Sequence, residues 1–133
     1  MNKANIEQAL KHFQAQLPEE PEWVIMVRTS GEFVGRIGEY HFFYPQAIDD
    51  SIATLWTHAH GIHILETLDH LNHGGLDYSM TFGGNRTFFL FHLNYAFFLG
   101  ITYNGVKSFD AIIVAVLMNI DSLLEAINPS TPT

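Results

Sequence analysis

Trp23-Val24-Ile25-Met26-Val27 is the stretch that decides the fold, and Phe88-Phe89-Leu90-Phe91 and Phe97-Phe98-Leu99 repeat its character. Neighbouring side chains of a strand point to opposite faces of a sheet, so a run without polar alternation needs cover on both faces. β-branched and aromatic residues are also favoured in strands. We therefore predict a sheet whose central strands are covered by helices on both faces.

Three segments have the spacing of helices that can supply this cover. Apolar residues recur at three- and four-residue intervals, and the prolines at 18 and 21 end the first such segment. Asp49 and Asp50 can cap and favourably charge the start of the second, and Ser108 can cap the third. The expected helices cover residues 6–17, 49–72 and 108–127.

Five strands lie between these helices, which gives the order α-β-β-α-β-β-β-α and an α+β fold. The third strand alternates apolar and polar residues, and glycines interrupt the second, so both are expected at the edges of the sheet. We predict an antiparallel sheet in the order 2-1-5-4-3. The expected strands cover residues 23–28, 33–37, 76–82, 86–93 and 96–103.

Composition restricts the class of protein further. The 133 residues are 47% hydrophobic and 15% charged, with a net charge of −8 and no cysteine. Such a chain is expected to be one ordered domain over 1–127 with a disordered tail at 128–133. Its acidity disfavours nucleic acid, and its apolar runs are far shorter than the ~20 residues of a membrane span. No membrane insertion is expected, and a cytoplasmic location fits best.

The element order, the turn Thr29-Ser30-Gly31-Glu32 and the closing pattern of two strands and an apolar helix over 88–127 resemble the roadblock family. This is the dynein light-chain type of domain, found also in prokaryotic regulators of small GTPases. The resemblance implies a profilin-like fold and a homodimer joined through the third strands, with the second helices side by side. It also implies a non-enzymatic scaffold or regulator that binds a small Ras-like GTPase.

The residues themselves also suggest a dimer interface. An edge strand with an apolar face invites pairing with a second copy. Several apolar residues of the second helix lie roughly 150° around its axis from Ile64. Either Gly61 kinks the helix and one face is buried throughout, or the helix is covered on two sides, which we favour. The predicted interface residues are Tyr78, Met80 and Phe82 on the strand and Ile52, Leu55, Trp56 and Ala59 on the helix.

Two further groups are candidates for partner binding. Phe42, Phe43 and Tyr44 form an aromatic cluster before the second helix, and accessible rings are common in binding hot spots. The alternative is that the second strand is longer and these rings pack in the core. His63 and His70 on the second helix are the other predicted partner-binding residues.

The histidines permit other interpretations. His63, Glu66, His70 and His73 share one helix face, with a spacing that suits metal ligands or a pH-sensitive surface. The simpler interpretation, which we favour, is a polar helix face. The sequence contains no P-loop, G-x-S-x-G, H-E-x-x-H or G-x-G-x-x-G motif. We therefore predict no enzyme and no catalytic, cofactor or metal site.

Two alternative functions remain open. The chain could be a small-molecule sensing module with a pocket between sheet and helix, or a structural subunit of a larger assembly. A closed hollow among Phe89, Phe91, Phe97 and Trp56 would favour the sensing module, and a filled space would favour the scaffold.

Overall fold

The computed structural model describes residues 3–40, 45–71, 77–93 and 96–127. Its elements follow the predicted order, and they form one antiparallel sheet in the predicted order β2-β1-β5-β4-β3. The sequence-based fold class is therefore confirmed. The elements are α1 (Lys3–Ala15), β1 (Trp23–Arg28), β2 (Phe33–Gly38), α2 (Gln46–Leu71), β3 (Asp77–Gly83), β4 (Arg86–Leu93), β5 (Phe97–Asn104) and α3 (Phe109–Ile127).

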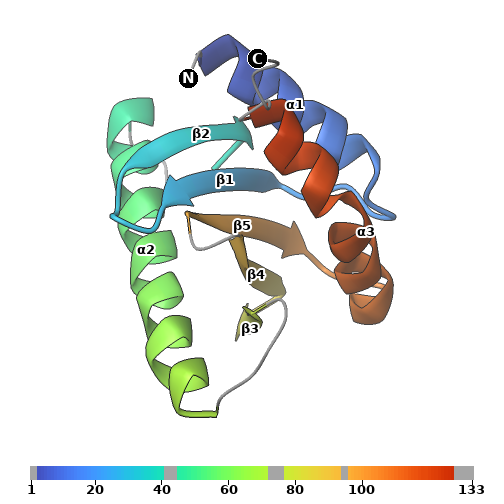
Figure 1. The fold of residues 1–133 in the computed structure, drawn as a ribbon. Helices are drawn as coiled ribbons and strands as arrows, with labels where there is room; N and C mark the ends of the chain where they lie inside the picture. Colours follow the sequence, from blue (N-terminus) through green and yellow to red (C-terminus); the bar gives the residue numbers. More distant parts are fainter. Residues whose placement is uncertain (1–2, 41–44, 72–76, 94–95, 128–133) are drawn as a thin grey trace, which may run out of the picture.

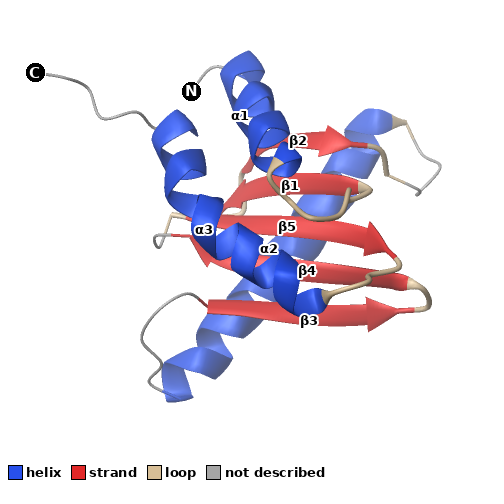
Figure 2. Cartoon of the chain, turned by 90° about the vertical axis from the view of Figure 1, so that its right-hand side faces the viewer, coloured by secondary structure: helices blue, strands red, loops and turns tan. Residues whose placement is uncertain are grey.

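The molecule has three layers (Figure 1), with α2 on one face of the sheet and α1 and α3 on the other. Figure 2 shows the sheet nearly face on, with α1 and α3 in front and α2 crossing behind all five strands. The three central strands are buried along nearly their whole length. These are the doubly apolar runs, so their predicted cover from both faces is confirmed.

The larger core lies under α1 and α3. It joins one side of the central strands to the buried stripes of the two helices, with fully buried Leu10, Phe89, Phe91 and Ile112 among its members. Phe89 and Tyr103 meet edge to face with ring centroids 5.6 Å apart. This aromatic packing closes the α1/α3 face of the sheet.

The smaller core lies under α2. It contains the residues of β1, β4 and β5 that point to the other side, together with Ala53 and Ile64. At Gly61 α2 approaches the sheet closely, because a Cβ there would lie 2.5 Å from the Phe98 ring. The helix is continuous through this glycine. Gly61 therefore does not end the helix, and cover of α2 on a second side remains a prediction.

Two sequence-based details can be checked against the structure. α2 begins at Gln46, directly after Pro45, whose carbonyl accepts the N–H groups of Ile48 and Asp49. Asp49 and Asp50 therefore lie inside the helix and do not cap it, although Asp49 lies in the first turn, where a negative charge is favourable as expected. A capping residue was expected from side-chain chemistry alone.

The second detail is the test of the sensing module, which asked whether Phe89, Phe91, Phe97 and Trp56 leave a closed hollow among them. Phe89, Phe91 and Phe97 belong to the core under α1 and α3, whereas Trp56 lies on α2 at the opposite face. The register places odd-numbered residues of β4 on the first face and even-numbered residues on the second. These four side chains therefore cannot line a common cavity.

The start of α3 is held by two side chains. Ser108 caps the helix as predicted, with its hydroxyl accepting the N–H of Ala111 at 3.3 Å. Glu19, from the loop after α1, accepts the N–H groups of Lys107 at 2.9 Å and Ser108 at 3.0 Å. These bonds lower the pKa of Glu19, with the Lys107 bond as the largest cause. Ser108 and Glu19 together hold the start of α3 against the end of α1.

No helix within the described part of the chain combines the length and the apolar character that crossing a membrane requires.

Candidate interaction surface

The outer face of α2 exposes apolar residues in its first half. Ile52 is 37% exposed, Leu55 70% and Trp56 44%, and Ala59 is also exposed. The opposite side of the same helix buries Ala53, Thr57 and Ile64 against the sheet. We call Ile52, Leu55, Trp56 and Ala59 the α2 stripe. A single chain leaves this stripe in contact with solvent.

The same helix side becomes polar further along. His63 and Glu66 follow the α2 stripe and are both exposed. The His70 side chain and the whole of His73 lie outside the described residues, so the four-residue histidine face remains a prediction. No cluster of three metal-ligating side chains occurs within the described residues.

The edge of the sheet nearest the C-terminal half of α2 is β3. Its alternating apolar residues Tyr78, Met80 and Phe82 are 41%, 37% and 63% exposed, and they project to the α1/α3 side. Tyr78 stacks on Phe91 at 5.8 Å, and Phe82 meets Phe109 at 5.7 Å. Between 78 and 82 the strand carries no charge and no proline. Such an edge lacks the usual features that prevent strand pairing.

The other edge, β2, is protected by a helix, a register shift and a charge. α1 packs so closely on it that a Cβ at Gly35 would lie 2.6 Å from the Ile6 side chain. Its pairing with β1 shifts register between Met26 and Val27, and it carries Arg36. A bulge, a charge and a covering helix are ways of protecting an edge. β3 is therefore the edge better suited to another chain.

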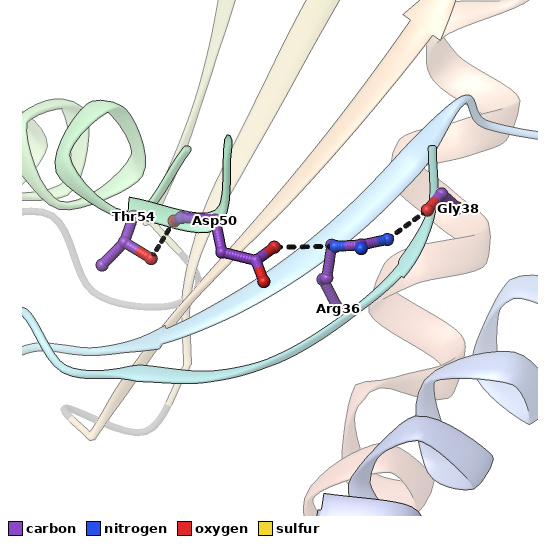
Figure 3. A network of polar contacts seen from close by, with 4 residues as sticks. All are labelled: Arg36, Gly38, Asp50 and Thr54. Atoms are coloured by element: carbon purple, nitrogen blue, oxygen red, sulfur yellow. Dashed lines mark hydrogen bonds and ion pairs between the residues drawn. The ribbon is translucent and has the colours of Figure 1, made fainter. Parts of the chain in front are cut away.

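A polar network fixes α2 against β2 (Figure 3). Arg36 Nε donates to Asp50 Oδ1 at 2.8 Å, and its Nη1 donates to the carbonyl of Gly38. The Thr54 hydroxyl donates to the Asp50 carbonyl at 2.7 Å. The Arg36 guanidinium also lies 4.7 Å from the centre of the Tyr40 ring. The network sets the position from which the α2 stripe faces outward.

Tyr40 precedes the aromatic cluster of Phe42, Phe43 and Tyr44 and lies within the described residues. Its ring meets Trp23 edge to face at 5.1 Å. Burial, and then the neighbouring Asp50 carboxylate, raise the pKa of Tyr40 well above its usual range, so it stays a neutral phenol. Tyr40 thus packs against the core under α2. Phe42, Phe43 and Tyr44 lie outside the described residues, and their role in partner binding remains a prediction.

The two parts of the candidate surface were both singled out from the sequence. The structure places the α2 stripe and the β3 residues in exposed positions, although on different sides of the sheet. Sequence reasoning missed Arg36 and Asp50 as the residues that position α2. Their opposite charges were visible, but nothing local indicated that the strand and the helix meet there.

No protein-family model matches the chain, and no curated protein matches it. Solved structures do match it. Myxococcus xanthus MglB has a TM-score of 0.64 at 10% identity, covering 98% of this chain and 90% of that one. The gliding protein MglB from Thermus thermophilus has a TM-score of 0.72 at 11% identity, with coverages of 98% and 96%.

A third structure, an MglB with a tetrameric arrangement, has a TM-score of 0.70 at 12% identity and covers 95% of this chain and 92% of that one. The matches span nearly the whole of both partners. The chain therefore has the MglB-like, roadblock-type fold, and the sequence-based resemblance is confirmed for the fold.

Proposed function

We propose that this chain is a cytoplasmic, non-enzymatic homodimer that regulates or positions a small Ras-like GTPase. The observation that carries the proposal is the α2 stripe together with the unprotected β3 edge. Solvent-exposed apolar side chains on an ordered helix indicate a surface that another protein covers. The roadblock-type fold supports a small GTPase as the partner, because the resemblance of the sequence to the roadblock family implies a regulator of such proteins.

In the first step of the proposal, two β3 strands pair across a twofold axis. A self-complementary interface of this kind is the commonest arrangement in homodimers. Pairing around Met80 would join two five-stranded sheets into one and satisfy the backbone groups on the outer side of each β3. α2 lies beside β3 on one face of the sheet, so the same axis would bring two α2 helices together.

In the second step, the paired α2 helices form the surface that meets the GTPase. Trp56 and Leu55 supply the large apolar contacts that hold the two α2 helices together, so the surface depends on the dimer. His63 and Glu66 continue the same helix side and would form a polar rim. Regulation would follow from different affinities for the GTP-bound and GDP-bound conformations.

The dimer is tested by two matched pairs of variants. Met80→Lys places a charge on the β3 edge, and Met118→Lys places the same charge on α3, where Met118 is 77% exposed. Leu55→Glu and Leu117→Glu form the corresponding pair on α2 and α3, since Leu117 is 50% exposed. In sedimentation equilibrium, we expect a dimer for the parent chain and both α3 variants and monomers for the β3 and α2 variants.

The GTPase is tested with the same proteins as baits. Immobilised chain should retain a GTP-binding protein from its native cell extract, and retention should differ between GDP and a non-hydrolysable GTP analogue. Leu55→Glu should abolish retention, whereas Leu117→Glu should preserve it. Binding of the same purified GTPase by calorimetry then confirms direct contact.

Two results would separate the parts of the proposal. A parent chain that stays monomeric at high concentration contradicts the dimer. A stable dimer that retains no GTP-binding protein contradicts the GTPase role and favours the structural-subunit alternative.

A further inference from the structure

A cleft opens on the α2 face of the sheet, between the first half of α2 and the hairpin of β3 and β4. Its volume is about 270 Å³. This is at the small end of the range for ligand pockets, and it suits a molecule built on a single ring. The residues that line it are Trp23, Ile52, Trp56, Thr81, Phe82, Gly83, Arg86, Phe88 and Thr102.

Aromatic rings form the walls of this cleft. The Phe88 ring lies 5.9 Å from Trp23 and 5.8 Å from Trp56, measured between ring centroids. Trp23 and Phe88 are buried and fixed by the sheet, whereas Trp56 is 44% exposed on the helix. Rings favour offset-stacked or edge-to-face neighbours, so a planar aromatic molecule is the best match for these walls.

The floor of the cleft provides a polar group. Thr102 on β5 pairs with Trp23 on one side and Phe88 on the other, which places it between two of the walls. Thr102 is 5% exposed, and its hydroxyl is buried with no hydrogen-bond partner among the described residues. A buried hydroxyl in this state is unfavourable, and a ligand that hydrogen-bonds to it would relieve that cost.

The positive charge at the mouth of the cleft is already paired with a carboxylate. Arg86 is the charged member of the described lining, and its Nε donates to Glu22 Oε1 at 2.7 Å. That hydrogen bond is the largest cause of the raised pKa of Arg86. A ligand carboxylate would have to displace Glu22, so the cleft favours a neutral molecule.

We infer that this cleft is a binding site for a small, neutral, planar aromatic molecule with one hydroxyl or similar hydrogen-bonding group. The ring lies among Trp23, Trp56 and Phe88, and the polar group meets the Thr102 hydroxyl. Rotation of the half-exposed Trp56 indole gives the ligand access to the floor. The cleft shares Ile52 and Trp56 with the α2 stripe, but ligand binding to the chain alone can be measured without any GTPase.

The chain reports on this site directly, because it has two tryptophans and both line the cleft. In a ¹⁵N-labelled sample of the full chain, the two indole N–H resonances are followed during titration with p-cresol and, separately, with toluene. Saturable shifts of both indoles are expected with p-cresol, with a dissociation constant on the order of 1 mM or below.

Three variants identify the contacts. Thr102→Val should weaken p-cresol binding by about 2- to 10-fold, the usual effect of one hydrogen bond, and leave toluene binding unchanged. Thr57→Val is the matched control, since its buried hydroxyl also lacks a described partner but does not line the cleft. Gly83→Leu should block both compounds. A Cβ at Gly83 meets nothing within 4 Å, so the larger side chain is accommodated, and alternation along β3 directs it to the α2 face, where it occupies the cleft.

Two results would overturn the inference. The first is a parent chain whose indole resonances do not move with p-cresol; if they move with protein concentration instead, the cleft is assigned to a side chain from a second copy. The second is equal p-cresol affinity in Thr102→Val and Thr57→Val.

Discussion

The two faces of the sheet are covered in different ways. On the α1/α3 face, two helices bury a large aromatic and aliphatic core that includes Phe89 and Phe91. On the α2 face, one helix covers a smaller core, leaves Trp56 half exposed and buries the hydroxyls of Thr57 and Thr102 without described partners. The α1/α3 face therefore holds the larger and more completely packed core, although β3 and α3 also expose apolar side chains on that side. The α2 face holds the smaller core and leaves more of its lining incompletely packed.

The largest expected effect lies on the α1/α3 face. Phe91→Ala should lower the free energy of unfolding by about 3–5 kcal/mol, because it leaves a cavity in a fully buried aromatic cluster. Trp56→Ala should cost much less, since almost half of that side chain is already exposed. Urea unfolding of both variants measures the difference. Equal losses would contradict the contrast between the two faces.

The second effect tests how closely α2 approaches the sheet. Gly61→Ala adds a methyl group 2.5 Å from the Phe98 ring, which is itself fully buried. The helix or the ring must move, and we expect a loss of about 1–3 kcal/mol despite the better helix propensity of alanine. Urea unfolding measures it. Ala59→Gly, on the exposed side of the same helix, is the comparison and should cost about 1 kcal/mol of helix propensity when both variants are unfolded at a concentration where the chain is monomeric.

The third substitution should raise the free energy of unfolding, whereas the first two lower it. Thr57→Val replaces a buried hydroxyl without a described partner by a methyl group of the same shape, so it should raise the free energy of unfolding by about 1 kcal/mol. Thr54→Val is the comparison, because it removes the hydrogen bond from Thr54 to the Asp50 carbonyl. It should destabilise the protein. Urea unfolding measures both variants. A higher free energy of unfolding for Thr54→Val than for Thr57→Val would refute this account of the α2 face.

The smallest effect concerns the loop that fixes α3. The pKa of Glu19 is lower in the folded protein than its ordinary value of 4.5, so its stabilising contribution is present above that pH and is lost as the pH falls through the folded pKa. Glu19→Gln should lower the melting temperature slightly at pH 7, and this difference should disappear once the pH has fallen below the folded pKa of Glu19. Glu20→Gln, one residue along and exposed, is the control. A loss that persists at low pH would contradict the charge-based explanation.

Much of the fold followed from local patterns. The run at 23–27 and its counterparts in β4 and β5 identified the central strands, and the alternation at 78–82 identified β3 as an edge. Ser108 marked the start of α3 because capping depends on residues close in sequence. The start of α2 was misplaced, since acidic residues inside a first turn look the same as a cap.

The candidate surface was less predictable. The sequence showed that α2 has two apolar sides, but not which one faces the sheet. That choice depends on the contact between Gly61 and Phe98 and on the Arg36–Asp50 pair, both of which join distant parts of the chain. Whether Phe89 and Trp56 share a hollow could not be judged from the sequence for the same reason, because the sheet separates them.

The amino-acid sequence by itself determined the number, type and order of the elements and the edges of the sheet, because hydrophobic period and turn chemistry act over a few residues. Only the tertiary structure decided which side of α2 is exposed, how Glu19 reaches α3 and where a cleft opens beside Thr102. Those features arise where elements cross in space, and the distances involved depend on the packing of the whole molecule.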